Sequence, residues 1–123
     1  MRIRNLMTIA AVVGGAACSD STYGGGGGGC TPTATQVCAQ AAAFAPTNLT
    51  ITAGQTVTWR HGSGAAHTVT SATNSTDVYD GTLGVGATFS RPFNTPGTYP
   101  FYCKNHGANG TPPTGMSGTI TVQ

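Results

Sequence analysis

The segment from residue 96 to residue 122 constrains the fold more than any other, because two stretches of it alternate between inward and outward positions. One face of each stretch consists of Tyr99, Phe101 and Cys103 in the first and of Met116, Gly118, Ile120 and Val122 in the second. Period-two alternation with aromatic and β-branched residues is typical of half-buried β-strands. The segment therefore predicts two strands whose inward faces each bring a sulfur atom to the same end of a sheet.

The connection between these strands adds a nitrogen ligand, because His106 follows Cys103 by three positions. Two soft sulfur donors and an imidazole suit copper better than any hard cation. A second imidazole can come from His67, which opens the strand-like run HTVT after a Gly-rich segment. His61 competes for this role, but it follows Arg60 in a Gly-rich loop and is expected to be exposed to solvent.

With these residues the chain resembles the cupredoxins, specifically the small plastocyanin-like blue copper domains of bacteria. The matching segments are Phe44-x-Pro46, Leu49 to Trp59, His67, Gly97 to Tyr99, Phe101 to His106 and Met116 to Val122. The resemblance implies an all-β, Greek-key β-sandwich. It also implies one type 1 copper ion bound by a thiolate, two imidazoles and a distant thioether, from Cys103, His67, His106 and Met116.

Two of the implied roles depend on position alone. Nine residues separate His106 from Met116, more than the cupredoxin pattern commonly has. At the usual spacing the axial position would fall on Thr111, a poor copper ligand, so we assign the extra residues to a longer loop. The alternative is that Met116 only fills a gap in the core. Thr68 is expected to lie next to the copper ligands and to donate a hydrogen bond to the cysteine sulfur.

The predicted site carries electrons rather than transforming a substrate. Catalytic metal sites keep a vacant position, and none is expected here, so the protein is not predicted to be an enzyme. Copper oxidases and nitrite reductases need further His clusters, whereas this chain has three His in total. We predict a one-electron carrier between exported or membrane redox partners. The alternatives are a copper-binding or storage lipoprotein, a zinc site and a metal-free sandwich with a structural or adhesive role.

Charge predicts how a partner would bind. The whole chain has a formal charge of +2, but two of its Arg lie at the N-terminus. The charged residues that remain after residue 17 are Arg60, Arg91, Lys104, Asp20, Asp77 and Asp80, with a formal charge of zero. No basic stripe is left for a nucleic acid. We therefore expect a redox protein to dock by apolar contact beside His106, on a patch of Gly107, Ala108, Pro112 and Pro113.

Residues 1–17 are typical of a lipoprotein signal peptide. Arg2 and Arg4 precede a short apolar run, and small residues stand directly before Cys18. The apolar run is shorter than the roughly 20 residues that span a bilayer. We therefore predict export to the periplasm or cell surface, with Cys18 carrying a lipid that anchors the protein to a bacterial membrane. The alternative is ordinary secretion with cleavage nearby.

A linker and one domain are expected to follow. Residues 18–35 include six consecutive glycines and predict a flexible linker. Residues 36–123 then form a single β domain. Its several short strands, with Gly, Pro, Asn and Thr between them, indicate an antiparallel sandwich. Its expected strands are Val37 to Phe44, Leu49 to Ile51, Val57 to Trp59, His67 to Thr70, Ala87 to Phe93 and the two of the C-terminal segment. Residues 71–86 are expected to be irregular, with at most a short strand near Val78.

The cysteines leave one pair. If Cys18 takes a lipid and Cys103 binds copper, Cys30 and Cys38 remain. Disulfides persist in the compartments to which exported chains are sent. We predict a structural disulfide between these two residues, the alternative being a redox-active or metal-binding pair.

Overall fold

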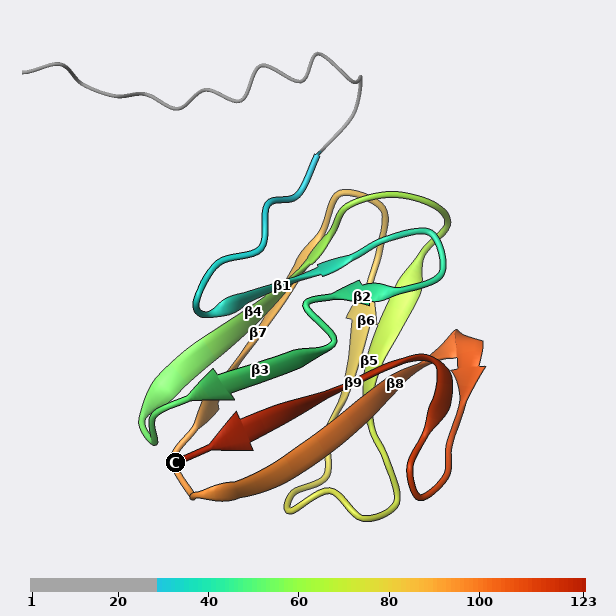
Figure 1. Cartoon of the computed structure of the whole chain (residues 1–123). Helices are drawn as coiled ribbons and strands as arrows, with labels where there is room; N and C mark the ends of the chain where they lie inside the picture. Colours follow the sequence, from blue (N-terminus) through green and yellow to red (C-terminus); the bar gives the residue numbers. More distant parts are fainter. Residues whose placement is uncertain (1–28) are drawn as a thin grey trace, which may run out of the picture.

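The computed structural model describes residues 29–123, and within that range every regular element is a β-strand (Figure 1). The strands are β1 (Gln36–Ala39), β2 (Phe44–Ala45), β3 (Asn48–Ile51), β4 (Gln55–His61), β5 (His67–Ser71), β6 (Asp80–Leu83), β7 (Thr88–Phe93), β8 (Gly97–Ala108) and β9 (Thr114–Val122). The prediction of an all-β sandwich is confirmed. In this part of the chain no helix is long and apolar enough to cross a membrane.

The strands form two sheets, with the orders β2-β1-β4-β7 and β3-β9-β8-β5-β6. Most neighbours are antiparallel, but β1 runs parallel to β4 and β3 runs parallel to β9. The sheets are therefore mixed. The short strands had predicted a purely antiparallel sandwich, and that prediction is wrong for these two pairs. Both parallel pairs join strands that are distant in sequence, and pairs that no hairpin connects are free to run in the same direction.

Two segments differ from the expected strands. The strand expected from Val37 to Phe44 is divided by a turn, in which the N–H of Gln40 donates to the carbonyl of Ala43 over 2.8 Å. As a result β2 folds back on β1 as its antiparallel partner. The segment expected to be irregular, residues 71–86, contains β6, which pairs with β5 along its whole length and buries alternate residues.

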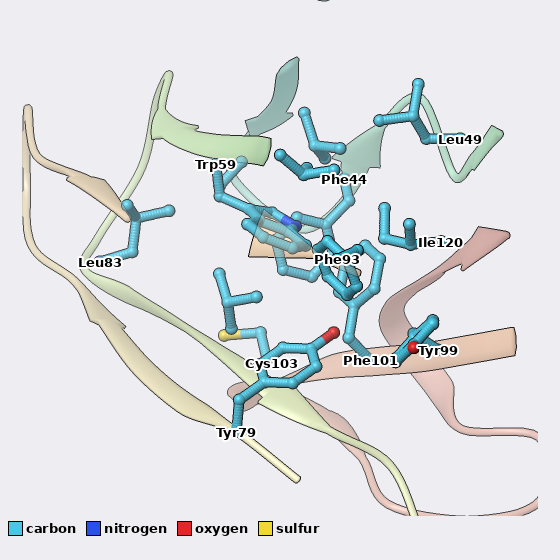
Figure 2. Packing of buried hydrophobic residues seen from close by; sticks show 14 of the residues in the cluster. Phe44, Leu49, Trp59, Tyr79, Leu83, Phe93, Tyr99, Phe101, Cys103 and Ile120 are labelled. Carbon is cyan, nitrogen blue, oxygen red and sulfur yellow. The ribbon is translucent and has the colours of Figure 1, made fainter. Parts of the chain in front are cut away.

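The core lies between the sheets and is centred on Trp59. Its ring centroid is 5.4 to 6.1 Å from those of Tyr79, Phe93 and Phe101, which lie around it in Figure 2. It is also 5.8 Å from that of Phe89. Phe89 is half-buried, whereas the other four of these rings are buried. Cys103 and Met116 belong to the same buried cluster. Packing in the core therefore restrains both sulfur-bearing side chains.

Pro100 lies inside β8, where a strand residue normally donates a ladder hydrogen bond. It stands opposite Thr119 of β9 and beside the end of β5, which stops at Ser71. Its carbonyl accepts the N–H of Ala72 over 2.9 Å. The missing N–H therefore faces the point at which β5 ends, where the ladder does not continue.

The segment before β1 is bonded to the sheet. Cys30 and Cys38 form a disulfide. Thr33 and Gln36 also exchange two backbone hydrogen bonds of 3.2 and 3.3 Å. Part of the expected linker, residues 30–35, is thus held against β1. Cys18, the predicted signal peptide and residues 19–28 of the linker lie outside the described residues.

Candidate metal centre

Three of the predicted ligands converge at one end of the five-stranded sheet. His67 is the first residue of β5, whereas Cys103 and His106 lie near the end of β8. The Nδ1 atoms of the two His are 3.1 Å apart, and the Cys103 Sγ lies 3.7 and 3.6 Å from the Nδ1 of His67 and of His106. His67 and Cys103 are buried, and His106 is exposed.

This triangle of atoms fits a single soft metal ion. Metal–imidazole and metal–thiolate bonds are about 2.0–2.3 Å long, so atoms at the observed separations can share one ion. No carboxylate belongs to the group of metal-binding side chains found among residues 29–123. A thiolate and two imidazoles form the trigonal ligand set that binds copper in blue copper proteins.

The imidazole of His67 is held with its Nδ1 toward the site. Its Nε2 lies 3.2 Å from the carbonyl oxygen of Ser63, which can only accept, so Nε2 carries the proton. Burial lowers the pKa of His67, and His106 and His61 lower it further, against the opposing effect of the Ser63 hydrogen bond. A neutral imidazole with a bare Nδ1 is the form that binds a metal.

Thr68 connects the strands that carry two of the predicted ligands. Its backbone N–H donates to the Sγ of Cys103 over 3.4 Å. Its Oγ1 accepts the backbone N–H of Lys104 over 2.9 Å. The thiolate is the metal-binding form of cysteine, and it can accept such a hydrogen bond. Thr68 therefore lies where the resemblance placed it, and its main-chain group contacts the sulfur.

The segment between His106 and Met116 forms a hairpin rather than an irregular loop. The β8–β9 register shifts between Tyr102 and Gly107, after which Gly107 stands opposite Gly115. The connection between β8 and β9 leaves the sheet at this point (Figure 1). Met116 directly follows Gly115, and the partner of Gly115, Gly107, directly follows His106. The side chain of Met116 is 1% exposed. Thr111 lies in the exposed part of the connection.

The expectation that His61 is exposed to solvent is wrong, because it is 4% exposed. Its ring stacks on that of His67, with centroids 5.4 Å apart and an interplanar angle of 28°. His61 is the last residue of β4, where it continues the buried alternation of Val57 and Trp59. That alternation is visible in the sequence and could have placed His61 inside.

Comparison with solved structures places this architecture in a known class. A purple cupredoxin from Nitrosopumilus maritimus is similar over 72% of this chain and 99% of its own, with 26% identity and a TM-score of 0.58. A copper-containing nitrite reductase from Thermus scotoductus has the same TM-score at 22% identity. The match covers 76% of this chain but 23% of the reductase, so it shows a shared fold only. The sandwich and its Cys/His₂ group are those of a cupredoxin.

The family follows from the sequence match. A model of the copper-binding proteins of the plastocyanin/azurin family matches residues 32–123, and the chain belongs to that family. A plastocyanin from Scenedesmus fuscus is 38% identical over 93 residues, which are 68% of this chain and 89% of the plastocyanin. The prediction of copper as the cofactor is confirmed by the family together with the Cys/His₂ group.

Proposed function

We propose that this protein is a type 1 copper protein that carries one electron at a time between exported or membrane redox partners. The observation that carries the proposal is the triangle of one sulfur and two nitrogen atoms with sides of 3.1 to 3.7 Å. His67, Cys103 and His106 are the proposed strong ligands, and Met116 is the proposed weak axial ligand. Copper supplies the centre that gains and loses a single electron.

The chain's own contribution is to hold the ligands still. The proposed ligands come from three neighbouring strands of one sheet, and only His106 is exposed. Hydrogen bonds from Ser63 and Thr68 restrain the imidazole of His67 and the sulfur of Cys103. A site whose geometry changes little between oxidation states has a small reorganisation energy. This suits an electron carrier better than a copper-storage protein. The hydrogen bonds and the apolar surroundings tune the reduction potential.

The exposed imidazole of His106 is the proposed exit for the electron. Ala108 and Pro112 nearby are exposed, and Gly107 and Pro113 are half-buried. The exposed Lys104 and Asp80 form a salt bridge of 2.7 Å with each other, so they add no net charge. This supports docking of a redox protein on the uncharged patch. An Ala108→Glu variant should slow electron self-exchange, measured by NMR on mixed oxidised and reduced protein, while leaving the visible spectrum unchanged.

Spectroscopy and voltammetry test the proposal. Copper-loaded protein should show intense visible absorption from thiolate-to-copper charge transfer and a reversible one-electron wave. Cys103→Ser should abolish both while circular dichroism shows the fold retained. Uptake of Cu(I) without a reversible wave would instead support storage. Metal analysis of protein purified without added copper would reveal zinc.

Export and lipid anchoring at Cys18 remain part of the proposal and rest on the sequence of residues 1–18 alone, which lie outside the described residues. Mass spectrometry of the mature protein from a bacterial host tests them. A lipid mass on Cys18 that is absent from Cys18→Ser supports the anchor. An unmodified, cleaved chain in the medium or periplasm contradicts it.

A further inference from the structure

His61 is a buried polar side chain that is not one of the proposed copper ligands. It ends β4 in the four-stranded sheet, whereas His67 begins β5 in the five-stranded sheet. The two rings are nonetheless stacked face to face. The only covalent connection between them is residues 62–66. His61 therefore brings the four-stranded sheet into contact with a proposed metal ligand of the other sheet.

Hydrogen bonds tie both imidazoles to this connection. The Nε2 of His61 lies 2.9 Å from the carbonyl oxygen of Ala65 and 3.2 Å from that of Gly64. Both oxygens can only accept, so Nε2 carries a proton that they share. The Nε2 of His67 makes the same kind of bond to the carbonyl of Ser63. Three consecutive carbonyls of the connection are thus bonded to the two stacked rings.

The backbone at His61 is hydrogen-bonded to neighbouring segments of the four-stranded sheet. Its backbone N–H donates to the carbonyl of Ala87 over 2.9 Å, and its neighbour Gly62 donates to Ala39 over 2.8 Å. The preceding inward residues of β4, Val57 and Trp59, are apolar. An imidazole costs more to bury than such side chains unless its N–H is bonded. The bonds that it makes here go only to the connection that presents Ser63 to His67.

We propose that His61 is a positioning residue for His67: its ring covers one face of the ligand imidazole, and its Nε2–H holds the connection whose Ser63 carbonyl sets the ligand's orientation. This inference rests on the proposed role of His67 as a copper ligand. If the support is lost, the His67 ring can rotate about its Cβ–Cγ bond and turn Nδ1 away from Cys103. Loss of such supporting groups typically weakens metal binding about 10–100-fold.

The test compares His61→Ala, which removes both the ring and the donor, with His61→Phe, which keeps a flat ring and loses the donor. Ile51→Ala is the matched control, because Ile51 is buried opposite Val122, at the other end of β9 from Met116. The first readout uses metal-free protein: the solvent exchange rate and ¹⁵N shifts of the His67 imidazole by NMR. The second readout is copper affinity by competition with a chelator.

We expect His61→Ala to speed exchange of the His67 Nε2–H at least tenfold and to weaken copper binding about 10–100-fold. His61→Phe should fall between His61→Ala and the unmodified protein, and it carries the test alone if His61→Ala does not fold. Exchange and affinity that are unchanged in the His61 variants, or altered equally in Ile51→Ala, would overturn the proposal. Because the NMR readout needs no copper, it stands even if the unmodified protein fails to show a type 1 spectrum.

Discussion

Gly107 stands opposite Gly115 in the β8–β9 ladder, so the extra residues between them form a side hairpin that closes before Met116 is reached. A Cβ on Gly107 would lie 2.8 Å from the carbonyl oxygens of Thr114 and Met116. A Cβ on Gly115 would lie 2.8 Å from the carbonyl oxygen of His106. Only glycines allow the strands to approach this closely. The pair explains how a long spacing in sequence is compatible with a compact site.

Replacing Gly115 by Ala should disturb both folding and the site. Gly115 has a φ of 69°, where Ala is strained, and the added methyl group would also contact the backbone of His106. We expect a loss of more than about 1 kcal/mol in the free energy of unfolding and a shifted visible absorption band. The control is Gly86→Ala, whose φ is 74° but whose Cβ would meet nothing within 4 Å. Equal effects of the two variants would show that backbone strain alone matters.

A Thr68→Val variant should distinguish the role of the Thr68 hydroxyl from that of its backbone N–H. The variant keeps the N–H that donates to Cys103 but leaves the backbone N–H of Lys104 without its 2.9 Å acceptor. We expect urea titration to show a loss of about 0.5–1.5 kcal/mol in unfolding free energy. Voltammetry should show a changed potential, because β5 and β8 are less firmly held together. Thr121→Val, in β9 opposite Thr98, is the control and should leave the potential unchanged.

The metal-free protein should become less stable as the pH falls below about 6.5, the ordinary pKa of His. The pKa of His67 is lowered in the folded state, mainly by burial, so below pH 6.5 the unfolded chain binds more protons there than the folded one. Its contribution is complete above the unfolded pKa and is lost as the pH falls through the folded pKa. Urea titrations between about pH 5 and 8 measure this. A His67→Gln variant with the same pH dependence would contradict the assignment.

Removing the disulfide should destabilise the domain without changing the ligand set. The loop between Cys30 and Cys38 is short, with a sequence separation of 8, and closing a loop of that size contributes about 2–3 kcal/mol. A double Cys→Ser variant should therefore unfold at a lower guanidinium concentration. Cys38 is fully buried and Cys30 is half-buried, so a mild thiol reagent should reduce the disulfide slowly, by attack at the Cys30 sulfur. Rapid reduction of the native protein would instead favour a redox-active pair.

Tyr79→Phe should leave the protein as stable as before or more so. The Tyr79 hydroxyl is buried and has no hydrogen-bond partner among the described residues, and burial raises its pKa above the usual value. Removing an unsatisfied group costs nothing and can add about 1 kcal/mol. Tyr99→Phe is the contrast, because the Tyr99 hydroxyl donates to the carbonyl of Thr95 over 2.6 Å. Thermal unfolding should show Tyr99→Phe destabilised and Tyr79→Phe not.

The strands and site residues that could be predicted are those indicated by a pattern within a short stretch of sequence. Alternation within short runs indicated most of the strands, and the placement of Cys103 near a strand end, three residues before His106, indicated the site. The resemblance to cupredoxins also pointed to His67 and Thr68, which the structure places beside the sulfur. The turn within residues 40–43 and strand β6 were missed, because their sequences carry weak strand and turn signals.

The kinds of ligand, the all-β class and the apolar faces followed from the sequence, because these depend on residue type and on a spacing of two along the strand. Three features became apparent only in the folded chain: His61 lies against His67, the hairpin closes at Gly107 and Gly115, and two strand pairs are parallel. The parallel pairs join residues far apart in the chain. The other two pairs are closer in sequence, but they meet only because of how the strands on either side of them pair and pack, and no local pattern records that.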